Sequence, residues 1–151
     1  MYKNILIAVD GSSASERGLA EGLRLAKATG GKVILLHVVN ALLLESEAAS
    51  TAYFQALAES FQKQGEEILG KAAAAAREAG VAFEQKLVVK IGALASDEIV
   101  AVAKSSKVDL IVIGTHGRRG LKRVVMGSDA ELVLRQSPVP VLMVREQADS
   151  K

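Results

Sequence analysis

Four stretches of the chain are almost continuously apolar over the length of a β-strand, at residues 5–9, 33–39, 108–113 and 139–144. Short runs rich in valine, leucine and isoleucine are typical of strands that are buried on both faces of a parallel sheet. Residues 81–89 alternate only partly between apolar and polar side chains, which indicates a strand at a sheet edge. The pattern therefore predicts five strands.

Between these stretches, apolar residues recur every three to four positions, which is the spacing of one face of an α-helix. This spacing predicts four helices, at residues 13–29, from Tyr53 to Gly80, around residues 99–103, and at residues 128–136. Ser13 with Glu16, and Ser128 with Glu131, have the spacing of a capping box, in which the serine is the N-cap. Both serines are therefore expected to begin helices.

The predicted elements alternate as βαβαβαβαβ, without a linker, a change in composition or an internal repeat. Strands that alternate with helices favour a parallel sheet with helices on both faces. We therefore expect an α/β fold with a single doubly wound, Rossmann-like sheet of five strands. At 151 residues, the chain is expected to form one domain, over residues 1–151.

Composition excludes several classes of protein. The chain has no cysteine, so disulfides and thiolate metal sites are excluded. A net charge of +2 with 3% aromatic residues does not indicate a nucleic-acid-binding protein. No apolar run reaches the ~18 residues of a membrane span, and the first residues lack the pattern of a signal peptide. We expect a cytoplasmic protein that binds neither nucleic acid nor membrane.

The most informative stretch for function is the glycine-rich segment after the predicted strand 108–113. That strand stops at Gly114, and Gly117, Gly120 and Gly127 follow before Ser128 opens a helical pattern. A strand, a glycine-rich loop and a helix N-terminus together form an anion site, because free N–H groups and the helix dipole both favour phosphate. The alternative is a surface loop with turn glycines and a serine that only caps the helix.

Asp10 places a carboxylate at the end of the first predicted strand. It is either a turn or capping aspartate, or a ligand-binding group. Ligands of doubly wound sheets bind at the carboxyl ends of the strands, where the strand order reverses. If the first and fourth strands are neighbours there, Asp10 and Gly114 meet at one crevice. The chain lacks G-x-x-x-x-G-K-[ST] and a G-x-G-x-x-G after the first strand, which argues against a P-loop NTPase or an NAD enzyme.

The glycines have a specific spacing, Gly114-x2-Gly117-x9-Gly127-Ser128. This spacing resembles the G-2x-G-9x-G-[ST] signature of the ATP-binding branch of the universal stress protein family. The segments ILIAVDGS, LLHVV, DLIVIGTHG and SPVPVLMVR extend the resemblance over the whole chain. The resemblance implies an ATP-binding regulatory protein of the stress response.

The resemblance also implies which residues bind ATP. Asp10, beside Ala8 and Val9, would hold the ribose and help order a bound Mg²⁺, and Val38 would contact adenine through its backbone. The other implied contacts, along the fourth strand and the loop and helix after it, are Ile113, Gly114, His116, Gly117, Arg118, Gly127, Ser128 and the amide of Asp129. Asp129 departs from the family pattern, because similar proteins usually carry a small apolar residue there.

Two residues allow a second interpretation. Arg118, with the other basic residues of the loop, either neutralises phosphates or belongs to a solvated basic loop. His116 either donates a hydrogen bond to phosphate or is a plain loop residue.

His37 lies inside an apolar run without a cluster of other ligands, so we expect a hydrogen-bonded core histidine rather than a metal ligand.

Three functions remain open at this point. The first is an ATP-binding stress regulator with at most slow hydrolysis, since no hydrolytic motif surrounds the candidate site. The second is an adenine-nucleotide hydrolase or adenylate-transferring enzyme of the same superfamily. The third is a ligand-free, partner-binding dimer, in which Asp129 has closed the phosphate site.

The last predicted strand, Val139 to Val144, ends the sheet with a hydrophobic edge, and such an edge pairs readily with another strand. Similar proteins form dimers through this strand, so the resemblance implies a homodimer. Leu142 and Val144 are the side chains expected at this interface.

Overall fold

The computed structural model describes residues 1–40, 51–90, 93–115 and 127–146. Five strands and four helices alternate in these residues, as predicted. The strands are β1 (Asn4–Ala8), β2 (Lys32–Asn40), β3 (Phe83–Lys90), β4 (Leu110–Gly114) and β5 (Val141–Val144). The helices are α1 (Ser13–Thr29), α2 (Thr51–Ala79), α3 (Ala95–Ser105) and α4 (Ser128–Gln136).

The five strands form one sheet in the order β3-β2-β1-β4-β5, and every neighbouring pair is parallel. The predicted α/β fold is confirmed, and β3 lies at an edge as expected. Ile5 pairs with Val33 on one side and with Leu110 on the other, so the strand order reverses between β1 and β4. The first and fourth strands are therefore neighbours at the reversal point, which is where ligands of such sheets bind.

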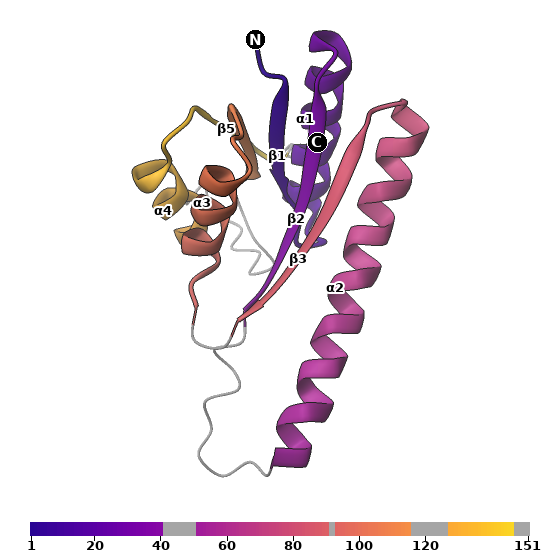
Figure 1. Ribbon diagram of the computed structural model, residues 1–151, viewed down its shortest axis with the longest axis vertical. Coiled ribbons are helices and arrows are strands. Elements are labelled where there is room, and N and C mark those ends of the chain that lie inside the picture. Colours follow the sequence, from indigo (N-terminus) through magenta and orange to yellow (C-terminus); the bar gives the residue numbers. More distant parts are fainter. Residues whose placement is uncertain (41–50, 91–92, 116–126, 147–151) are drawn as a thin grey trace, which may run out of the picture.

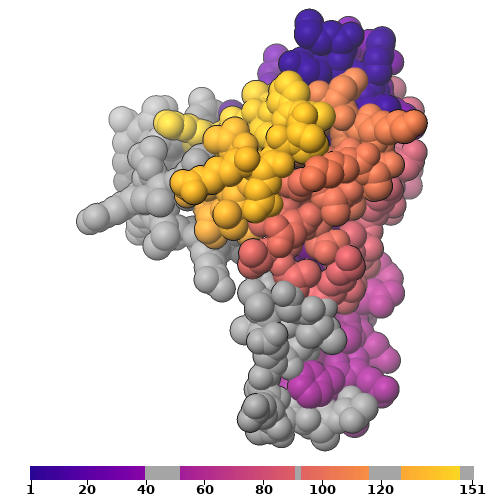
Figure 2. All heavy atoms as spheres, turned by 60° about the vertical axis from the view of Figure 1, so that its left-hand side comes forward, coloured from indigo at the N-terminus to yellow at the C-terminus, as the bar shows by residue number. Residues whose placement is uncertain are grey.

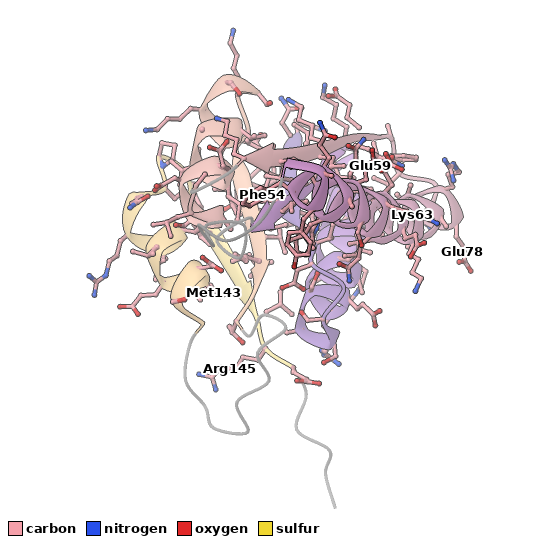
Figure 3. All side chains as sticks on the ribbon, turned by 90° about the horizontal axis from the view of Figure 1, so that it is seen from below. Phe54, Glu59, Lys63, Glu78, Met143 and Arg145 are labelled. Carbon is pink, nitrogen blue, oxygen red and sulfur yellow. The ribbon has the colours of Figure 1, made fainter. Side chains whose placement is uncertain are left out.

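Side chains of β1 point alternately to two cores. Ile5 and Ile7 pack with residues of α1 and α2, whereas Leu6 and Ala8 pack with residues of α3 and α4. Figure 3 shows α1 and α2 on one side of the sheet and α3 and α4 on the other. Figure 1 shows the same layers along the sheet, and Figure 2 shows the outer surface of α3 and α4. The sheet is thus covered on both faces, which explains why its central strands are almost continuously apolar.

Two predicted helix caps are wrong by one residue. The N-cap of α1 is Ser12 rather than Ser13, because the Ser12 hydroxyl accepts a hydrogen bond from the Ser15 N–H at 3.2 Å. The N-cap of α4 is Gly127 rather than Ser128, and the Glu131 N–H donates to the Gly127 carbonyl at 3.1 Å. Both serines are therefore the first residue inside their helices, and neither forms the predicted capping box.

The last strand is shorter than predicted, since β5 begins at Val141 rather than at residue 139. Pro140, directly before it, has no N–H to donate to a ladder. Its carbonyl still accepts a hydrogen bond from the Ile111 N–H at 3.0 Å, which fixes the start of β5 against β4. The outer edge of β5 remains unpaired within the described sheet.

Candidate functional site

The carboxyl ends of β1, β2 and β4 meet at one edge of the sheet, and the N-terminus of α4 lies at the same edge. β4 ends at Gly114, and Asp10 follows the last residue pair of β1. These two residues are distant in sequence and are brought together by the parallel pairing of β1 with β4. The condition for the predicted crevice is therefore met, since β1 and β4 end side by side at the point where the strand order reverses.

Asp10 is held by the first turn of α1. Its Oδ1 accepts a hydrogen bond from the Ser12 N–H at 2.8 Å, and its own N–H donates to the Ser15 hydroxyl at 3.0 Å. One carboxylate oxygen thus stabilises the turn, as the capping interpretation expected. Ser15 is buried, with 5% of its surface exposed, and its positioning role was missed from sequence. The signal was a polar residue on the core-facing side of a predicted helix.

Val38 presents its backbone to the crevice because β2 continues beyond the end of β1. The ladder between the two strands ends with the pair Ala8 and Leu36, and the Val9 N–H donates to the Leu36 carbonyl at 2.8 Å. Backbone groups of residues two apart in a strand point to the same side. The N–H and carbonyl of Val38 therefore point to the side where β1 has ended, as expected of a residue that contacts a ligand through its backbone.

The predicted hydrophobic contacts fall into two groups. The side chains of Ala8 and Val38 are only partly buried although they lie on central strands, and both pack with the core beneath α3 and α4. Val9 and Ile113 are 5% and 7% exposed, so their side chains belong to the core. The Val9 carbonyl also lies 2.7 Å from Nδ1 of the buried His37. Ala8 and Val38 are thus the side chains with surface near the crevice.

Gly114 has a packing requirement of its own. A Cβ at this position would lie 2.7 Å from the Ala14 carbonyl carbon and 2.9 Å from the Ser15 nitrogen. Real Cβ atoms do not approach backbone this closely, so the first turn of α1 can sit against β4 only if residue 114 is glycine. Part of the glycine signature therefore serves helix–sheet packing.

The two ends of the glycine-rich loop are tied together. The Gly127 N–H donates to the Thr115 carbonyl at 2.6 Å, and the Thr115 N–H donates to the Val144 carbonyl at 3.0 Å. Thr115 is buried, and its role was missed because this contact spans residues far apart in the chain. The start of α4 is thereby fixed next to the end of β4.

The first turn of α4 faces solvent at Ser128 and Asp129, which are both exposed. Because Gly127 is the N-cap, Asp129 is the second helical residue rather than the first. First-turn N–H groups have no acceptor within their own helix, and the helix dipole favours an anion there. The predicted phosphate contacts at Gly127, Ser128 and the Asp129 amide are therefore consistent with the position of this helix.

His116, Gly117 and Arg118 lie outside the described residues. His37 is the hydrogen-bonded core histidine that the sequence predicted, since it is 9% exposed and contacts the Val9 carbonyl. Within the described ranges, no group of three or more acidic, histidine or cysteine residues could hold a metal ion.

No helix among the described residues is long and apolar enough to cross a membrane.

Comparisons with known proteins identify relatives over almost the whole chain. A profile of the universal stress protein family matches residues 1–145. Universal stress protein MJ0531 of Methanocaldococcus jannaschii is 33% identical over 146 residues, which cover 97% of this chain and 84% of that protein. The solved structure of MJ0577 is 29% identical, covers 99% of both chains and superposes with a TM-score of 0.86.

Two other similar structures contain adenine nucleotides. A universal stress protein in complex with cAMP is 25% identical, with a TM-score of 0.71 over 97% of this chain and 98% of that chain. The universal stress protein of Archaeoglobus fulgidus in complex with dAMP is also 25% identical, with a TM-score of 0.70 over 95% and 98%. The family signature in the sequence, the strand order and these matches agree, and the chain belongs to the universal stress protein family.

Proposed function

We propose that the protein binds ATP in the crevice between the carboxyl ends of β1, β2 and β4, and acts as a nucleotide-dependent regulator in the stress response. The observation that carries this proposal is the backbone of Val38, which points past the end of β1 towards the crevice. A purine base has donors and acceptors on its edge that can pair with such a backbone segment. The relatives solved with cAMP and dAMP support an adenine nucleotide as the ligand.

The remaining parts of ATP follow from this orientation. With the base at Val38, the ribose lies over the end of β1, where Asp10 supplies a carboxylate oxygen that can accept a hydroxyl hydrogen bond. The phosphates then lie against the first turn of α4, at Gly127 and Ser128, where the helix dipole favours negative charge. Ala8 provides a small apolar surface beneath the sugar.

Magnesium fits this site as a companion of the phosphates. Mg²⁺ in nucleotide sites is bound by one or two carboxylates together with phosphate oxygens and waters. Asp10 supplies one carboxylate, and one of its oxygens is hydrogen-bonded to the Ser12 N–H. We infer that Asp10 would orient the ion and that phosphate oxygens and waters would supply its other ligands.

Regulation rather than hydrolysis is the proposed activity. A hydrolase must orient a water or an acceptor at the phosphate and stabilise the charge that develops there. Asp10, Asp129 and Glu131 are the described carboxylates closest in the chain to the phosphate elements, and Glu131 forms an ion pair with Arg135 at 2.8 Å. An adenylate-processing enzyme would show turnover of labelled ATP well above the slow rate expected here.

A thermal-shift experiment tests the choice of ligand. ATP with Mg²⁺ should raise the melting temperature, because a ligand that binds only the native state stabilises it. At a hundred times its dissociation constant it adds about 2.7 kcal/mol, which is roughly 5–10 °C for a chain of this size. GTP and NAD should produce much smaller shifts. Equal shifts from all three nucleotides, or none from ATP, would contradict the proposal, and the latter would favour the ligand-free dimer.

Substitution of Asp129 tests whether its carboxylate weakens the binding of the phosphates. An acidic side chain in the first turn stabilises a helix by about 0.3–1 kcal/mol. We expect Asp129→Val to lower the free energy of unfolding by about this amount and to change ATP affinity by less than about threefold, because the side chain is exposed. Calorimetry with ATP and with adenosine is the measurement. A tenfold gain for ATP alone would show that Asp129 repels the phosphates.

We also propose a homodimer that pairs through the free edge of β5. Leu142 is 38% exposed on this edge strand, whereas Val144 is 8% exposed and packs in the core, so Val144 is a poor position for a test substitution. Leu142→Lys should therefore convert the dimer to a monomer, because a charge at a paired edge opposes association. Light scattering measures the mass.

The matched control is Leu94→Lys, since Leu94 is 43% exposed and lies before α3, away from β5. It should leave the mass unchanged. A dimer that persists in Leu142→Lys but dissociates in Leu94→Lys would place the interface near α3 instead.

A further inference from the structure

A cavity of about 670 Å³ lies between α1 and α2. Its volume is in the range of pockets that bind small molecules. These helices cover the face of the sheet opposite α3 and α4 (Figure 3), so the cavity is separated by the sheet from the core beneath α3 and α4. The family comparison does not account for it.

Glycines in both helices create the cavity by holding each helix close to different strands. A Cβ on Gly22 of α1 would lie 2.5 Å from Cδ1 of Ile7, on β1. A Cβ on Gly65 of α2 would lie 2.7 Å from Cδ1 of Leu87, on β3. Because β2 separates these two strands, each helix sits low over its own part of the sheet and a cleft remains between them.

Small side chains keep this cleft from being filled. The residues of α2 that line it include Ala72, Ala75 and Ala79, whose side chains are single methyl groups. Leu19 and Leu23 of α1 form apolar walls and are only 9% and 5% exposed. Walls with so little accessible surface admit a slender chain rather than a partner helix.

Charged side chains are arranged along the cleft with a polarity. α1 and α2 both follow strands of a parallel sheet, so they run in the same direction. Glu16 and Glu67 come earlier along their helices, and Lys27 and Lys71 come later. Neither lysine forms an ion pair with a described residue. Acidic residues therefore lie towards one end of the apolar cleft, whereas Lys71 lies one turn beyond Glu67 and Lys27 lies towards the other end.

We propose that this cleft binds a single-chain amphiphilic anion, with its aliphatic chain between Leu19, Leu23 and the alanines of α2 and its carboxylate or phosphate near Lys27 and Lys71. A methylene chain is narrow enough for walls of this kind. An anionic head is favoured at the basic end and disfavoured at the acidic end, which fixes the direction of the chain.

Calorimetry with saturated carboxylates of eight, ten and twelve carbons, below their micelle concentrations, tests the proposal. Each buried methylene should raise affinity by about fourfold, so that each two-carbon step gives roughly a fifteenfold increase. Dodecanol, which lacks the charge, should bind more weakly than dodecanoate. A flat response to chain length, or an absence of dodecanoate binding, would overturn the proposal.

Matched variants of α2 locate the binding. Ala75→Leu places a side chain in the cleft and should weaken dodecanoate binding at least tenfold, whereas Ala74→Leu, at an exposed position outside the lining, should not. Lys71→Gln should weaken binding several-fold, and Lys63→Gln, on the outer surface of α2 (Figure 3), should leave it unchanged.

The thermal melting of each variant shows whether it is folded. Leucine is a good helix former, so neither alanine-to-leucine substitution should disrupt α2. Equal binding by Ala74→Leu and Ala75→Leu would place the ligand elsewhere and overturn the assignment. The end of the cleft lined by Val9, Gly11 and Ser15 adjoins the nucleotide crevice. Dodecanoate that is displaced by ATP and is insensitive to Ala75→Leu would therefore lie in that crevice, which would also contradict the proposal.

Discussion

Gly127→Val should abolish ATP binding while the protein remains folded. The loss is expected because Gly127 is the N-cap of the helix whose first turn meets the phosphates, and a branched side chain there occupies the space that glycine leaves for close backbone approach. Its backbone angles, φ −58° and ψ 144°, suit valine, so the substitution causes no backbone strain. We expect at least a hundredfold loss of affinity, equivalent to about 2.7 kcal/mol, by calorimetry.

Gly70→Val is the matched control for this experiment. It introduces the same side chain into α2, where a Cβ would have no heavy atom within 4 Å. It should leave stability unchanged or raise it slightly, because valine is a better helix former than glycine, and it should leave ATP affinity unchanged. If Gly127→Val retained ATP affinity within threefold, the phosphates would not lie against the start of α4, and the proposed orientation of the nucleotide would be wrong.

The fold was predictable from sequence to the extent that hydrophobic spacing specifies it. The boundaries of α4 were predicted correctly, because an apolar stripe and polar flanks define them. The caps were not, since adjacent candidates such as Ser12 and Ser13 have the same chemistry and only hydrogen-bond geometry selects one of them. The neighbouring positions of β1 and β4 could be stated only as a condition, because strand order depends on which crossovers the whole chain makes.

The candidate site could likewise be predicted from sequence only in part. Asp10 could be identified because a carboxylate directly follows a buried strand. Ser15 and Thr115 could not, since each acts through a backbone or side-chain contact that depends on how helices and strands pack. The sequence also could not reveal that Val144 would be buried while Leu142 on the same strand stays exposed, because the difference depends on what covers each position.

Gly114→Ala should destabilise the protein strongly even when no nucleotide is added. The new methyl group would lie 2.7 Å from the carbonyl carbon and 2.8 Å from the carbonyl oxygen of Ala14. These are backbone atoms at the start of α1, so the helix itself must shift away from β4. Overpacking of this kind costs about 1–3 kcal/mol, and we expect the upper part of that range, or roughly 10 °C in melting temperature.

Gly18→Ala is the matched control, because it changes the other glycine at the same contact between α1 and β4. Its Cβ would lie 3.5 Å from the Gly114 nitrogen, an ordinary van der Waals distance, and alanine is favoured over glycine inside a helix by about 1 kcal/mol. This variant should therefore be as stable as the wild type or slightly more stable.

The two variants together separate two roles of the signature glycine at position 114. An unchanged melting temperature in Gly114→Ala, together with a loss of ATP affinity, would show that Gly114 is required by the ligand and not by the packing of α1. A loss of stability in the absence of nucleotide would show that this part of the family signature specifies the contact between helix and sheet on which the position of Asp10 depends.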